Sequence, residues 1–337
     1  MSSRTFLVTG GAGFLGSALV RGLVAAGHRV RSLDNHARGR SNRLDDLGPA
    51  VEALSADIRD ADAVSSAVAG VDCVCHLAYV NGTEYFYSMP ETVLDVGVRG
   101  MLNVLDACRR HNVRDLVLVS SSEVYQDAPT VPTDESVPLV VPDPLNPRYS
   151  YGGGKIISEL LAINYGRKDF DRVSIIRPHN IFGPDMGWEH VIPQFALRAH
   201  LLSTRQPEGA LEFPIRGDGG ASRSFMYVGD FVRAALLVID KGERLGIYHV
   251  GVPNEITVAE LAHRIGRCLG RDVRVVAGPA PAGEPRRRCP DTRKLQRLGF
   301  SSQADFQTAL EFTVKWYAAN AAAAPERAVQ TSPRSYE

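Results

Sequence analysis

The sequence of 337 residues predicts an α/β fold, in which a doubly wound parallel sheet carries a smaller, mostly C-terminal region. The first half of the chain alternates short apolar segments with longer helical ones, at the spacing of β-α-β units. The short segments are continuously apolar, which is typical of strands that helices cover on both faces of a parallel sheet. After residue 177 the alternation gives way to loop-rich sequence.

Each expected element follows from its own pattern. The six expected strands are runs of apolar residues bounded by turn-forming or polar ones, at residues 5–9, 29–33, 51–56, 73–77, 115–120 and 172–176. The helices expected between them have apolar residues at helical spacing, at residues 16–26, 62–69, 90–111 and 151–167. Two more helices are expected in the C-terminal region, at 258–269 and 306–319.

Composition and charge exclude several classes of protein. Lys and Arg number 38, as do Asp and Glu, so no net charge favours binding to nucleic acid or to a membrane surface. No apolar run approaches the roughly 20 residues that span a bilayer, and the N-terminal residues lack the layout of a secretory signal. The five cysteines lack the spacing of a zinc site, so we expect them to be reduced in a cytoplasmic protein without a metal.

The segment LVTGGAGFLG, residues 7–16, links the first strand to the first helix. The spacing of Gly10, Gly13 and Gly16 allows a tight turn, close approach of the backbone to a pyrophosphate, and close packing of helix on strand. The free N–H groups of the helix N-terminus would bind the anion. This segment therefore predicts a dinucleotide site.

Asp34, at the end of the second strand, indicates which dinucleotide is bound. A carboxylate there accepts hydrogen bonds from ribose hydroxyls and repels a 2′-phosphate, which favours NAD over NADP. Arg38 and Arg40 would favour NADP, but we interpret them as solvated loop charges.

Tyr151 and Lys155 lie four residues apart and so share one face of the expected helix. A lysine ammonium favours the phenolate and lowers the pKa of a neighbouring tyrosine. Ser121, at the end of the fifth strand, could hydrogen-bond both the phenol and a substrate hydroxyl. Such a tyrosine can take the proton of an alcohol whose carbon gives a hydride to a nicotinamide. A phosphate-binding loop is excluded because Ile156 follows Lys155, where that motif needs Ser or Thr.

With these motifs in place, the chain resembles the extended short-chain dehydrogenase/reductase family, specifically its nucleotide-sugar epimerases, dehydratases and decarboxylases. The resemblance runs from about Thr5 to Tyr317, and its further motifs are HLA, SSSEVY, NPRYSYGGGK, RPHNIFGP, GDGGASRSFMYVGD and RRRCPDTRKLQRLGF. It implies a Rossmann-type fold, NAD as cofactor and a nucleotide-diphosphate sugar, by preference a UDP-sugar, as substrate. It also implies a homodimer formed through the helices near 90–111 and 151–167.

The resemblance assigns site residues. It implies Ser121, Tyr151 and Lys155 as the catalytic triad, and the chemistry of its carboxylate makes Glu123 a candidate base. Residues expected at the cofactor are Gly10, Gly13, Phe14, Leu15, Gly16, Asp34, Asn35, Gly39, Asp57, Ile58, Leu77, Ala78, Ser120, Tyr151, Lys155 and His179. Residues expected at the substrate are Asn81, Ser122, Asn180, Val191, Arg223, Arg288 and Asp291. We interpret Asp230 as a helix N-cap.

The chain departs from the family's pattern in four places. Phe182 stands where that pattern has a tyrosine, which is a mild change. Gly153 and Gly154 stand where alanine and serine are frequent, so we expect Gly154→Ser to be tolerated. An asparagine that is common near Gly97 is missing. The segment 79–87 holds many aromatic residues over the expected sugar site, which indicates either an unusual substrate or a packed helix start.

The family's reactions all begin with transfer of the C4 hydroxyl proton to Tyr151 and of hydride from C4 to NAD. We rank 4-epimerisation first because it requires least of the site. Glu123 leaves nucleotide-glucuronate decarboxylation and 4,6-dehydration open, although Ser122 replaces the acid of many hexose 4,6-dehydratases. A net sugar oxidoreductase and a non-catalytic NAD-binding regulator rank last.

We expect two regions and a tail. Residues 1–177 should form the NAD-binding domain, with returns to it near 224–250. Residues 178–223 and 251–319 should form the substrate region, and the Ala- and Pro-rich residues 320–337 a disordered tail.

Overall fold

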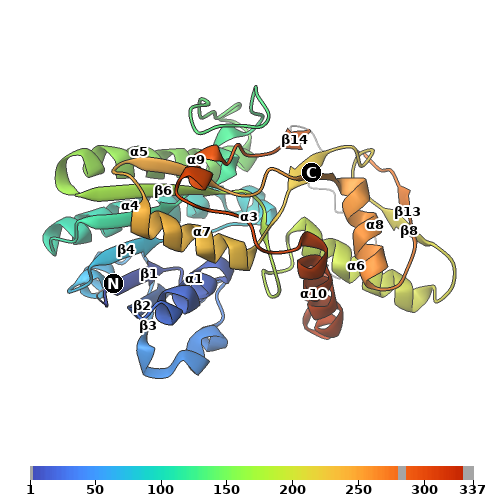
Figure 1. The fold of residues 1–337 in the computed structure, drawn as a ribbon, viewed down its shortest axis with the longest axis horizontal. Helices are drawn as coiled ribbons and strands as arrows, with labels where there is room; N and C mark the ends of the chain where they lie inside the picture. Colours follow the sequence, from blue (N-terminus) through green and yellow to red (C-terminus); the bar gives the residue numbers. More distant parts are fainter. Residues whose placement is uncertain (1–2, 280–285, 329–337) are drawn as a thin grey trace.

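The computed structural model describes residues 3–279 and 286–328, and a seven-stranded sheet organises them (Figure 1). Its strands lie in the order β11-β6-β5-β4-β1-β2-β3, and neighbours pair in parallel. They are β1 (Thr5–Thr9), β2 (Arg29–Asp34), β3 (Val51–Ser55), β4 (Cys73–His76), β5 (Asp115–Val119), β6 (Arg172–Pro178) and β11 (Gly246–Val250). The order reverses at β1 and β4, where doubly wound sheets bind ligands at the carboxyl ends of the strands. The predicted fold class is confirmed.

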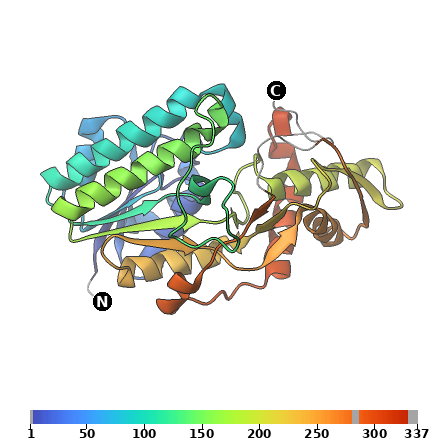
Figure 2. The same ribbon diagram turned by 90° about the horizontal axis from the view of Figure 1, so that it is seen from above.

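Helices cover both faces of the sheet (Figure 2). On one face α1 (Phe14–Ala25) packs against α7 (Val228–Lys241). On the other, α4 (Pro90–Arg110) packs against both α2 (Ala61–Val68) and α5 (Ser150–Asp169). None of the helices in the described part of the chain has the length and apolar character needed to cross a membrane.

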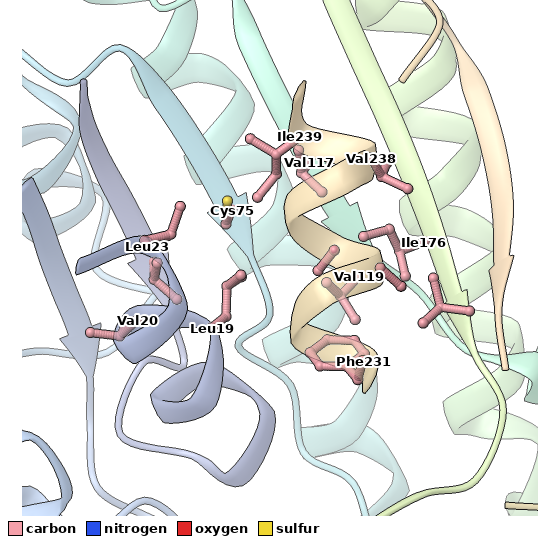
Figure 3. Close-up of a cluster of buried hydrophobic side chains, with 14 of the residues drawn as sticks. Leu19, Val20, Leu23, Cys75, Val117, Val119, Ile176, Phe231, Val238 and Ile239 are labelled. Atoms are coloured by element: carbon pink, nitrogen blue, oxygen red, sulfur yellow. The ribbon is translucent and has the colours of Figure 1, made fainter. Parts of the chain in front are cut away.

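Alternating strand residues build two separate cores. Phe6 and Val8 of β1 lie in the cluster between the sheet and the α1–α7 pair, and Figure 3 shows part of this cluster, with Leu19 of α1 and Phe231 of α7 labelled. Leu7, between them in sequence, points to the other face and packs with residues of α2 and α4. Burial on both faces explains why these strands are continuously apolar.

A second group of elements lies beyond the carboxyl ends of the sheet strands (Figure 1). Their third core is formed mainly by helices α6 (Val191–Arg205), α8 (Val258–Cys268) and α10 (Phe306–Ala319) with strands β8 (Leu211–Pro214) and β13 (Val273–Val276). The small strands are β7 (Ile181–Phe182), β9 (Ser222–Ser224), β10 (Met226–Tyr227), β12 (Glu255–Thr257) and β14 (Arg287–Arg288). Short helices are η1 (Ser41–Ala50), α3 (Thr83–Ser88), η2 (Ser122–Tyr125), η3 (Pro147–Tyr149), α9 (Arg293–Arg297), η4 (Ala321–Ala323) and η5 (Glu326–Ala328).

Two expectations differ from the structure. Asp230 is not an N-cap, because α7 begins at Val228 and its N-cap is Tyr227. The Asp230 carboxylate instead accepts hydrogen bonds from the Ser302 hydroxyl at 2.6 Å and from two backbone N–H groups of the segment before α10. The expected tail is helical at η4 and η5, and Ala321, Ala324 and Ala328 pack on the third core. Residues 329–337 lie outside the described residues.

Candidate active site

A cavity of about 520 Å³ opens at the carboxyl ends of β1 to β5. The turn between β1 and α1 borders it at one end, and the starts of η2 and α5 at the other. The loop before α6 and the strands β9 and β14 complete its wall. The cavity therefore joins the sheet to the C-terminal region.

The glycine turn leaves room for a ligand against the backbone. Gly10 has a φ of +71°, and a Cβ there would lie 2.8 Å from the Ala78 nitrogen. A Cβ on Gly16 would lie 2.0 Å from the Gly10 oxygen, so α1 could not pack so closely on the turn. Gly13, the N-cap of α1, has no side chain to bind the first N–H groups of the helix. This cradle suits the pyrophosphate of a dinucleotide.

Asp34 ends β2 inside the same cavity. Its carboxylate accepts hydrogen bonds from the backbone N–H groups of Ala12 at 3.0 Å and His36 at 2.8 Å. Arg38 also lines the cavity, with its guanidinium 5.4 Å from the centre of the Tyr85 ring and 3.3 Å from Glu189. The interpretation of Arg38 as a solvated charge is therefore wrong.

The structure brings Ser121, Tyr151 and Lys155 together at the other end of the cavity. Ser121 hydrogen-bonds the Tyr151 phenol, and the Lys155 Nζ lies 5.8 Å from the centre of the Tyr151 ring. Tyr151 and Lys155 are 5% and 3% exposed. Burial raises the pKa of Tyr151, which the Ser121 hydrogen bond partly offsets, and burial lowers the pKa of Lys155 to about 7. The expected lowering of the tyrosine pKa is thus outweighed by desolvation.

Charges gather around Glu123, next to this group. Its carboxylate contacts the guanidinium of Arg288. Burial raises the pKa of Glu123, but Arg288, together with Arg148 and Arg223, outweighs burial and lowers it. Glu123 is therefore a carboxylate at neutral pH.

Most residues predicted for the site line the cavity. At the substrate end these are Asn81, Ser122, Asn180, Val191, Arg223 and Arg288. His179 and Asp291 are not brought to it. The His179 ring is buried 4.8 Å from the His249 ring, and the Asp291 carboxylate binds Arg293. At the cofactor end, every predicted residue except His179 lines the cavity.

The structure adds residues that sequence reasoning left without a role. Phe86 stacks on Tyr151 with ring centres 4.8 Å apart, and Tyr79 meets Tyr151 edge-on at 5.1 Å. Arg148 joins the charges at Glu123. The aromatic richness of segment 79–87 was the signal for the first two.

Tyr79 also overturns one expectation. A Cβ on Gly154 would lie 2.1 Å from the Tyr79 hydroxyl oxygen. Gly154→Ser therefore requires Tyr79, a half-buried residue with an enclosed hydroxyl, to move.

Comparison with known proteins gives the class of protein. The chain belongs to the NAD-dependent epimerase/dehydratase family, which it matches over residues 6–251. This confirms the predicted membership of the extended short-chain dehydrogenase/reductases and of an NAD-dependent enzyme family.

Individual relatives differ in reaction. A dTDP-4-dehydro-6-deoxy-D-allose reductase of a Streptomyces species is 30% identical over 94% of this chain and 97% of its own. UDP-glucuronic acid decarboxylase 1 of Arabidopsis thaliana is 32% identical over 86% of this chain and 64% of its own. The UDP-glucose 4-epimerase of Thermus thermophilus, solved with NAD, superposes with a TM-score of 0.81 at 28% identity, covering 93% of this chain and 98% of that one.

Proposed function

We propose that the protein is an NAD-dependent nucleotide-sugar 4-epimerase that acts through a transient 4-keto sugar. The observation that carries this proposal is the state of Glu123, the carboxylate beside Tyr151. Arg288 keeps it ionised, and Ser122 stands where many hexose 4,6-dehydratases have an acid, so neither residue supplies the acid that a departing C6 hydroxyl needs. Epimerisation requires proton transfer only at the C4 hydroxyl, where Tyr151 and Ser121 meet.

The residues divide this task. Tyr151 acts as a phenolate, formed when its own proton passes to solvent. It takes the proton of the C4 hydroxyl and later returns it, while Ser121 hydrogen-bonds its oxygen and holds the substrate hydroxyl beside it. The Lys155 ammonium offsets the negative charge that the phenol acquires when it loses its proton. Bound NAD supplies the acceptor and donor of the C4 hydride. Residues 10–16 and Asp34 would hold it.

The charges support a neutral sugar on a diphosphate. Arg148, Arg223 and Arg288 all act on the Glu123 carboxylate at this wall of the cavity. The two negative charges of a nucleotide diphosphate would be attracted to these guanidiniums, and Asn180 lines the same wall. Among nucleotide sugars we propose a UDP-sugar.

Decarboxylation of a nucleotide glucuronate is the second candidate. The Nε of Arg288 is buried and has no hydrogen-bond partner among the described residues. This unused donor lies at the cavity wall, where it could bind a C6 carboxylate.

We also propose a homodimer through α4 and α5. The two helices pack side by side, and Leu160 on α5 is 53% exposed. A large apolar residue open to solvent on such a pair supports burial by a second copy. Sedimentation velocity would test this. The cytoplasmic location stays a prediction.

Mass spectrometry of the products from UDP-, dTDP-, GDP- and CDP-sugars tests the reaction. A new isomer of unchanged mass is expected from at least one UDP-sugar. Loss of water as the sole change would contradict the proposal in favour of dehydration, and loss of carbon dioxide in favour of the second candidate.

A further inference from the structure

Tyr79 fills the space between Lys155 and two glycines of different helices. The centre of its ring lies 4.1 Å from the Lys155 Nζ. A Cβ on Gly97, in α4, would lie 2.2 Å from the Tyr79 hydroxyl oxygen, and one on Gly154, in α5, 2.1 Å from it. Both glycines therefore make room for the same phenol, at two positions where the chain departs from the pattern it resembles.

Lys155 has few other partners for its charge. Its ammonium donates to the Val119 carbonyl at 2.8 Å. Glu159, one turn further along α5, has both carboxylate oxygens bound by Arg177, at 2.9 and 2.5 Å. His76 of β4 is neutral near pH 7, because burial and then Lys155 lower its pKa to about 3. Tyr151 is a phenol with a raised pKa. Beside the Val119 carbonyl, the face of the Tyr79 ring, closer than that of Tyr151, is therefore the electron-rich group that faces the ammonium.

The ring of Tyr79, not its hydroxyl, carries this role. The hydroxyl is buried and has no hydrogen-bond partner among the described residues. Burial also raises the pKa of Tyr79, so the phenol stays protonated. An orphaned hydroxyl adds no stability, whereas a ring face attracts a desolvated cation.

We propose that Tyr79 is a positioning residue, whose ring holds the Lys155 ammonium beside Tyr151 and whose phenol explains why positions 97 and 154 are glycine. The proposal rests on the proposed function, in which Tyr151 and Lys155 are the reacting pair. Its tests use the thermal stability of the full chain, so they do not depend on a turned-over substrate.

The first test is a rescue experiment on the glycines. Gly154→Ala should lower the melting temperature by about 4 °C, because overpacking forces the half-buried Tyr79 ring, with its enclosed hydroxyl, to move. Adding Tyr79→Phe should restore it, since the next ring atom, Cζ, is 3.5 Å from the Cβ position. Gly97→Ala is the matched control that Tyr79→Phe should not rescue, because Cζ and Cε2 would remain at 2.4 and 2.5 Å. The proposal would be overturned if Gly154→Ala lowered the melting temperature equally in the native protein and in Tyr79→Phe.

The second test measures the ammonium itself. The folded-state pKa of Lys155, about 7, is below the ordinary value of 10.5, so stability should rise with pH between these values. Stability is measured against pH for the native protein, for Tyr79→Leu and for Tyr79→Phe, each with and without Lys155→Met. The difference between the two curves of each pair gives the rise that Lys155 causes. In Tyr79→Leu this rise should begin about one pH unit lower than in the native protein, and in Tyr79→Phe it should begin at the native pH.

The proposal would be overturned if the Lys155-dependent rise in stability began at the same pH in Tyr79→Leu as in the native protein. It would also be overturned if Tyr79→Phe shifted the start of the rise as much as Tyr79→Leu does. If Tyr79→Leu does not fold, Tyr79→Met replaces it. If both tests succeed and no nucleotide sugar is converted by the native enzyme, the role of Tyr79 towards Lys155 is supported and the proposed function is contradicted.

Discussion

The helices α1 and α5 both begin among glycines, but the glycines serve different purposes. In the turn before α1, added Cβ atoms would meet backbone, at the Gly10 oxygen and the Ala78 nitrogen. In α5, the three atoms nearest to such a Cβ at Gly154 all belong to side chains, and the Tyr79 hydroxyl oxygen is the closest. The glycines of the turn are fixed by the fold of the main chain. Gly154 depends on which neighbours the sequence supplies, so a change in a neighbour can relieve the contact.

Changes at the start of α5 should affect turnover, whereas changes at the start of α1 should affect NAD binding. The largest expected effect is the loss of turnover in Tyr151→Phe. We expect turnover of the substrate to fall by roughly 10³-fold, since general acid–base groups contribute about 10²–10⁴. NAD content, measured by absorbance after release from the purified protein, should be unchanged. Turnover close to that of the native enzyme would remove Tyr151 from the chemistry.

Gly16→Ala tests the backbone-limited start. Its Cβ would meet the Gly10 oxygen at 2.0 Å, so we expect a loss of about 3 kcal/mol in the free energy of unfolding and loss of bound NAD. Urea denaturation measures the free energy of unfolding, and titration with NAD measures the affinity. If the variant kept full NAD affinity, the backbone of the turn would be able to move aside for the added Cβ.

Asp34 and Glu123 differ in the same way, since one carboxylate is held by backbone and the other by side chains. The variant Arg288→Met tests this difference. Asp34 is held by backbone N–H groups, whereas Glu123 depends on guanidiniums. Because the folded-state pKa of Glu123 is lowered, its contribution to stability is present above its unfolded pKa and lost as the pH falls through the folded one.

Without Arg288 the pKa of Glu123 should rise, and stability should fall by about 2 kcal/mol at pH 7. Urea unfolding between pH 3 and 7, with Glu123→Gln as the control that removes the titrating group, measures both. A profile identical to that of the native enzyme would mean that Arg148 and Arg223 suffice.

Gly153→Ala should have the smallest effect, and a favourable one. Among the described residues, the only neighbour a Cβ would meet there is Val141 Cγ2, at an ordinary 3.5 Å. Alanine in a helix interior should stabilise the protein by roughly 0.5–1 kcal/mol. Destabilisation in urea would indicate that α5 needs all three of its glycines.

The strands and long helices could be predicted because their signals are local. β1 and α10 have the predicted bounds, since apolar runs and polar ends coincide there. The helix α6 was missed because it follows loop-rich sequence and carries Pro193 in its first turn. Six-residue α3 is too short to show a helical period.

The site could be predicted where one turn or one helix contains the whole constellation, as at residues 10–16 and at Tyr151 and Lys155. Tyr79 could not be given a role, because its partners come from α4 and α5, far along the chain. His179 and Asp291 were assigned by resemblance alone, and the structure sets them against His249 and Arg293 instead.

The edge strand β11 has a consequence for how the protein can be made and divided. It pairs with β6 only after the chain has passed through α6 and β8 to β10, and α7, which covers α1, precedes it. A fragment ending at β6 would expose an unpaired strand edge and the apolar side of α1. Exchanging the substrate region between relatives therefore means replacing several separate segments. During synthesis, the sheet cannot be completed until residue 250 has left the ribosome.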